Sequence, residues 1–140
     1  MANPSNTITA VAKQFVLDLE KKNIFLTNFA ELEAFLNPRS PLEQHLARYV
    51  AISAWRVARL ITLEKAVFDS QIDKVPGEHL PVALGAQAYM HLADNSRVLD
   101  LMGRSEARAF KAFKDALNLF FKVRQQFPSI DESPERTTIQ

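Results

Sequence analysis

The sequence predicts an all-α fold, a helical bundle of four main helices plus a short helical turn, with one long central helix. Apolar residues recur at helical spacing over most of the chain, and no segment shows the alternation typical of a strand. Glycine is scarce, with three residues in 140, whereas phenylalanine occurs ten times. We expect residues 1–128 to form a single helical domain and residues 129–140, which are polar and contain Pro134, to form a disordered tail.

The N-terminal part is expected to contain an amphipathic helix and then a short helix. The spacing of apolar residues predicts that the first helix ends near residues 21–23, where two lysines suit the C-terminal dipole. Residues 24–26 would form an apolar connector. Asn28 with Glu31 resembles a capping box, so the short helix is expected to begin there and to end before Pro38.

The central helix is predicted to begin at Ser40 and to continue to about residue 74. Ser40 can accept a first-turn N–H, Pro41 suits the first helical position, and Glu43 is the matching third-position acceptor. This helix is apolar on two sides, which is typical of a helix covered by neighbours on both. The broad face carries Leu42, Leu46, Tyr49, Val50, Val57, Leu60, Ile61, Leu63, Val67 and Phe68, and is expected to pack against the first and last helices. The opposite side is a seam of small residues, namely Ala47, Ala51, Ala54, Ala58 and Thr62.

The C-terminal part is expected to contain two further helices. The pattern predicts one over residues 81–94, a short helical turn over residues 98–102 that stops at Gly103, and a last helix over residues 104–126. The apolar stripe of the last helix consists of Ala109, Phe113, Ala116, Leu117, Phe120 and Val123, and its opposite, basic face carries Arg104, Arg108, Lys111 and Lys122.

Glu64 is the most unusual charged residue, because it lies within the broad apolar face of the central helix. A buried carboxylate must be paired or protonated. One reading is a metal ligand or a general acid; the other is an ion pair with an arginine of the last helix. We favour the ion pair, since no convergent partners for catalysis are found.

The remaining residues give little support to an enzyme. The chain has no cysteine and no glycine-rich phosphate loop, and its three histidines lack the paired spacing of zinc or di-iron sites. Ser53 and Ser105 have no nucleophile motif around them. The sequence therefore predicts no catalytic residue, no cofactor and no metal site.

Two surfaces are candidates for interaction. The first is the alanine seam of Ala47, Ala51, Ala54 and Ala58 with the neighbouring Trp55, Arg48 and Arg59, although Trp55 is more readily read as a core residue. The second is a basic surface that would bind nucleic acid, made of Arg48, Arg59, Arg104, Arg108 and Lys111. A charge stripe of this kind is more often the solvated side of an amphipathic helix, and the net charge of the chain is only +1.

Two segments resemble a family of uncharacterised bacterial helical proteins. Its central helix carries Trp-Arg-x-x-Arg followed by Glu, matched here by Trp55 to Arg59 and Glu64. Its last helix begins with Arg-Tyr-Glu-x-Arg, matched by Arg104 to Arg108 with Ser105 in place of the tyrosine. The resemblance covers residues 29–126 and implies an all-helical fold. It also implies a polar network that links the two longest helices, consisting of Glu64, Arg104, Glu106 and Arg108.

Taken with the fold, these features predict a non-catalytic helical interaction protein, a homo-oligomer or an accessory subunit. The partner would be a second copy or another protein, and the alternative is a nucleic-acid-binding accessory factor. No apolar stretch reaches the roughly 20 residues that a membrane span needs, and no secretory signal is seen, so a cytoplasmic location is expected.

Overall fold

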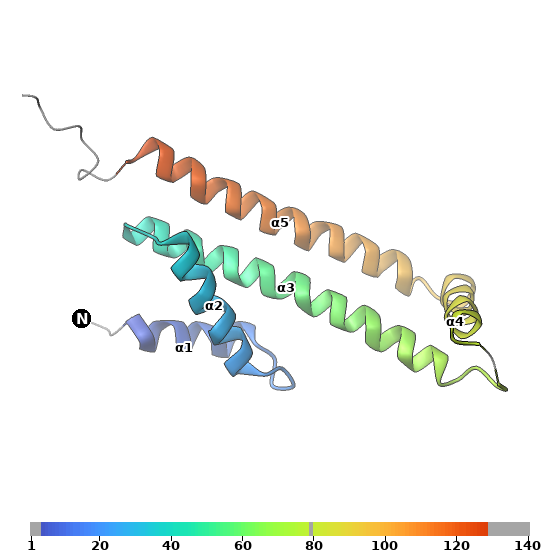
Figure 1. Ribbon diagram of the computed structural model, residues 1–140. Coiled ribbons are helices and arrows are strands. Elements are labelled where there is room, and N and C mark those ends of the chain that lie inside the picture. Colours follow the sequence, from blue (N-terminus) through green and yellow to red (C-terminus); the bar gives the residue numbers. More distant parts are fainter. Residues whose placement is uncertain (1–3, 79, 129–140) are drawn as a thin grey trace, which may run out of the picture. The chain divides into compact units, whose positions relative to one another are not determined.

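The computed structural model describes residues 4–78 and 80–128. These residues form five helices and no strand, so the all-α class is confirmed (Figure 1). The third helix is the longest, with 32 residues. The helices are α1 (Pro4–Phe15), α2 (Lys22–Leu36), α3 (Pro41–Ile72), α4 (Pro81–Asn95) and α5 (Val98–Gln126).

The chain divides into two compact units. Unit 1 consists of Met1–Ile52 and Lys114–Gln140, and unit 2 of Ser53–Phe113. Helices α3 and α5 each contribute residues to both units. The single domain expected for residues 1–128 stays a prediction, and the expected tail, residues 129–140, lies outside the described residues.

The helix α2 begins earlier than the sequence pattern indicates. It starts at Lys22, so residues 24–26 are helical rather than a connector, and Asn28 lies inside the helix rather than at its cap. No side chain caps this start, which explains why no local signal marks it. The helix ends at Leu36, followed by the cap residue Asn37, which has a left-handed backbone (φ 44°) and donates its N–H to the carbonyl of Glu33. Its buried side is aromatic and aliphatic, made of Phe25, Phe29 and Leu36.

The predicted start of α3 is confirmed by its hydrogen bonds. The Oγ of Ser40 accepts the N–H of Glu43 at 3.2 Å, and the Glu43 carboxylate reaches back to the N–H of Arg39 at 2.8 Å. The orientation expected for this helix is wrong in part. Leu42, Tyr49 and Ile61 of the broad face are each more than half exposed. The buried line instead runs through Glu43, Ala47, Val50 and Ala51.

The helix α4 belongs to unit 2, whereas α5 extends through residues of both units. The helix α4 follows Leu80 with proline at its first position, close to the predicted range. The helix α5 is continuous from Val98, so the predicted stop at Gly103 is wrong: one glycine costs a helix only about 1 kcal/mol relative to alanine. The buried apolar residues of α5 confirm its predicted stripe and are Ala109, Ala116 and Phe120. Within the unit, the Phe68 ring of α3 stacks on Tyr89 of α4 at 6.4 Å between centroids.

None of the helices in the described residues combines the length and the apolar character needed to cross a membrane.

Candidate functional site

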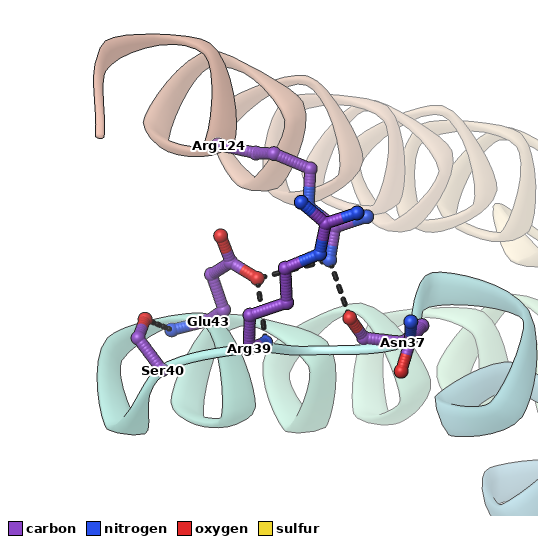
Figure 2. A network of polar contacts seen from close by, with 5 residues as sticks. All are labelled: Asn37, Arg39, Ser40, Glu43 and Arg124. Carbon is purple, nitrogen blue, oxygen red and sulfur yellow. Dashed lines mark hydrogen bonds and ion pairs between the residues drawn. The ribbon is translucent and has the colours of Figure 1, made fainter. Parts of the chain in front are cut away.

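A polar cluster in unit 1 joins the start of α3 to the last turns of α5 (Figure 2). The Nη2 of Arg124 donates to the Oε2 of Glu43 at 2.9 Å and to the carbonyl of Asn37 at 2.6 Å. The same carboxylate oxygen accepts the N–H of Arg39, while Ser40 caps the first turn beside it. The cluster therefore ties the end of α2, the start of α3 and the end of α5 together.

Burial makes this contact more than a surface ion pair. Glu43 is 4% exposed, whereas the side chain of Arg124 is 24% exposed. The hydrogen bond from Arg124 holds the pKa of Glu43 below its ordinary value, and this effect outweighs burial, which acts in the opposite direction. The guanidinium of Arg124 also lies over the Phe120 ring, 4.7 Å from its centroid.

Sequence reasoning assigned Glu43 only to capping and did not find its partner. The two residues are 81 positions apart, and no local pattern relates them. The Oε2 of the carboxylate accepts hydrogen bonds from the N–H of Arg39 and the Nη2 of Arg124, both within the chain. We therefore interpret the cluster as a structural lock of unit 1, not as a site for a ligand.

The buried ion pair predicted for Glu64 is wrong within the described part of the chain. Glu64 is half-buried, and no ion pair joins it to Arg104 or Arg108 there. Arg104 instead pairs with Asp100, one helical turn earlier, at 3.0 Å. The predicted network fails because Ile61 and Leu63 beside Glu64 are about half exposed, so its carboxylate retains access to water.

Unit 2 contains an open cavity of about 310 Å³ that is lined by residues of α3, α4 and α5. Both Glu64 and Glu106 lie in this lining. Its other side chains are mostly apolar, and three of them are half or more exposed: Leu63 (50%), Tyr89 (57%) and Leu101 (58%). We call this the apolar cavity.

A second hollow of about 510 Å³ adjoins the apolar cavity, since Leu60 and Ser105 line both. Three arginines line it: Arg56 and Arg59 from α3, and Arg108 from α5. In the described residues, neither Arg56 nor Arg108 forms an ion pair. We call this the arginine groove. The sequence analysis grouped Arg59 and Arg108 with other cations and did not predict this groove.

The structure buries part of the predicted alanine seam and leaves the rest of it half-buried or exposed. Ala47 and Ala51 are buried in unit 1, so the seam is not available to a partner at these positions, and this part of the prediction is wrong. Ala58 is exposed, and Ala54, Trp55, Arg48 and Arg59 are half-buried.

The described residues contain no group of three or more histidine or carboxylate side chains that would hold a metal ion. Comparisons with protein-family models, with curated proteins and with solved structures gave no significant match for this chain. The resemblance of the central and last helices to a bacterial helical family therefore stays a prediction.

Proposed function

We propose that this chain is a non-catalytic helical interaction protein that associates with a second copy of itself. The observation that supports the proposal is the apolar cavity of unit 2, whose side chains at Leu63, Tyr89 and Leu101 are half or more exposed. Apolar side chains that line a concave surface gain free energy when a partner removes them from water. The proposal includes action in the cytoplasm, which is supported by the absence of cysteine from the sequence.

A non-catalytic role is also supported by the serines. Ser53 is buried (6% exposed), so its hydroxyl is not accessible to a substrate. Ser105 does line the apolar cavity, but among the described residues no histidine or lysine lines it with Ser105 to act as the base that serine nucleophiles need.

The test is the mass of the protein in solution. We expect light scattering to give a mass that rises above the 15.8 kDa of one chain as concentration increases. Leu63→Glu and Leu101→Glu should keep the helical circular dichroism and lower the mass to that of one chain. Val82→Glu, at an exposed apolar position outside the cavity lining, is the matched control and should leave association unchanged. A wild type that remains a single chain at all concentrations contradicts self-association.

The alternative role, binding of nucleic acid, is favoured by the arginine groove alone. The basic surface predicted from the sequence has less support, because two of its cations already interact within the chain. Arg104 pairs with Asp100, and Lys111 also has an interaction. Phosphate-driven binding of a labelled oligonucleotide should weaken steeply between 50 and 200 mM salt, roughly a thousandfold or more for six phosphate contacts. Apolar self-association should not.

A further inference from the structure

We infer that the arginine groove and the apolar cavity together form the docking site for α2 of a second copy of this chain. This inference rests on the proposed self-association and names its two surfaces. The first argument is charge: Arg56 and Arg108 line the groove without an ion pair in the described residues, so an acidic segment is the complementary occupant.

The helix α2 presents an exposed face of the required chemistry. Ile24, Glu31 and Phe35 are spaced by seven and four residues, which places them on one side of the helix. Ile24 is 44% and Phe35 79% exposed and Glu31 is exposed, whereas the buried Phe25 and Phe29 lie roughly 120° around the helix from this face. Glu31 makes no ion pair in the described part of the chain.

The second argument is spacing: charged and apolar side chains are the same distance apart on α2 and on the α3 side of the proposed docking site. On α2, four residues separate Glu31 from Phe35; on α3, four residues separate Arg56 of the groove from Leu60, which lines both the groove and the cavity. Each step is about 6 Å along a helix axis. A helix lying along α3 thus sets its carboxylate against the arginines and its phenylalanine against the cavity at the same time. The lining of α3 from Arg56 to Phe68 extends about 18 Å, close to the 16–17 Å or so from Ile24 to Phe35.

A nucleic acid fits these observations less well. The groove adjoins the apolar cavity at Leu60 and Ser105, and Glu64 and Glu106 line that cavity. A phosphate backbone that continues along this path meets two carboxylates, and each such like-charge contact opposes binding. A short helix with one acidic residue would place that residue beside the arginines and only apolar residues beside Glu64 and Glu106.

The experiment is a charge exchange followed by sedimentation at several protein concentrations. Glu31→Arg should weaken self-association at least about tenfold, because it places like charges in contact. The double variant R56E/R108E should do the same. Mixing the two variants should restore association, since each now offers an opposite charge to the other. Restored association in the mixture, with each variant alone associating more weakly than the wild type, supports the proposal.

Matched controls separate local from general charge effects. R97E/K122E makes the same change in net charge at exposed positions outside the groove, and D94R reverses an exposed acid on α4. Both should associate like the wild type. Circular dichroism of each variant checks that its helices are intact.

Three outcomes would overturn the inference. If association is lost with Leu101→Glu but unaffected by E31R and R56E/R108E, the protein self-associates through another occupant, and only the inference fails. If the wild type is monomeric throughout, the proposed self-association fails with it. If the wild type binds a labelled single-stranded oligonucleotide, R56E/R108E abolishes this binding and E31R leaves the mass unchanged, the groove serves a phosphate backbone instead.

Discussion

At the scale of single residues, the Glu43–Arg124 contact is the interaction most sensitive to change. The carboxylate is almost completely buried, so it depends on the guanidinium that reaches it from 81 residues away. The Nε of Arg124 is also buried without a hydrogen-bond partner. This unsatisfied donor costs free energy and reduces the stabilisation that the contact provides. The net stabilisation by the pair is therefore smaller than the loss expected when one partner alone is removed.

We expect Arg124→Met to lower the free energy of unfolding by about 3 kcal/mol, because the Glu43 charge is left buried and unpaired. The double variant E43Q/R124M should lose less, since the amide keeps an acceptor for the N–H of Arg39 without a charge. Arg104→Met serves as the control, because its pair with Asp100 is exposed and worth at most about 1 kcal/mol. Urea unfolding followed by circular dichroism measures all three. Equal losses for Arg124→Met and Arg104→Met would contradict this account.

The same contact predicts a dependence of stability on pH. The pKa of Glu43 is lowered from its ordinary 4.5, so between the two values the unfolded chain binds more protons than the folded one. The contribution of Glu43 to stability is therefore complete above about pH 5 and is lost as pH falls through the folded-state pKa. E43Q should show a smaller decrease in melting temperature over this acidic range than the wild type. Parallel curves for the two proteins would mean that another group is responsible.

At the scale of the helices, the two glycines at positions 77 and 103 have opposite requirements. Gly103 lies within α5, and a Cβ built there has no heavy atom within 4 Å. Gly103→Ala should raise the free energy of unfolding by about 0.5–1 kcal/mol. Gly77 has φ of 90°, so Gly77→Ala should lower it by about 1 kcal/mol or more. Thermal unfolding of both variants measures the contrast, and a destabilised Gly103→Ala would show that the helix is interrupted there.

The alanine seam of α3 gives a second contrast along one helix. Ala51 is 6% exposed, whereas Ala58 is exposed. Ala51→Glu should cost several kcal/mol, because a charge would enter the core of unit 1 without a partner. Ala58→Glu should stay within about 0.5 kcal/mol of the wild type. Similar losses at both positions would indicate that the whole seam is covered.

These helices also show where sequence patterns suffice and where they do not. Ser40, Pro41 and Glu43 act on adjacent backbone groups, so the start of α3 could be predicted from local chemistry. The start of α2 has no side-chain cap, and its position is decided by the burial of Phe25 and Phe29, which is a tertiary effect. Partners distant in sequence, such as Glu43 and Arg124 or the two sides of the arginine groove, leave no periodic signal. The spacing of apolar residues on α3 predicted a buried Glu64. This prediction was wrong, because apolar residues near Glu64 are exposed.

At the scale of the whole molecule, the large buried side chains are divided unevenly. The four largest fully buried side chains of the described residues all belong to unit 1, and are Phe25, Leu36, Val50 and Phe120. The buried apolar residues described in unit 2 are Ala88, Leu92 and Ala109. Since removal of apolar area from water is the main favourable term in folding, unit 2 has the weaker core.

This imbalance gives a prediction that connects stability with association. At low protein concentration, amide hydrogens of unit 2 should exchange with solvent faster than those of the α2 and α3 residues in unit 1, because local opening requires less free energy there. Burying the apolar cavity beneath a second copy should protect unit 2, by an amount that grows with protein concentration. Exchange followed by mass spectrometry, at concentrations below and above the association midpoint, measures this change for peptides around Leu63 and Leu101. In E31R these peptides should stay unprotected at both concentrations, whereas in D94R they should gain protection as in the wild type. Protection of unit 2 that is the same at every concentration and in both variants would mean that its core is sufficient without a partner.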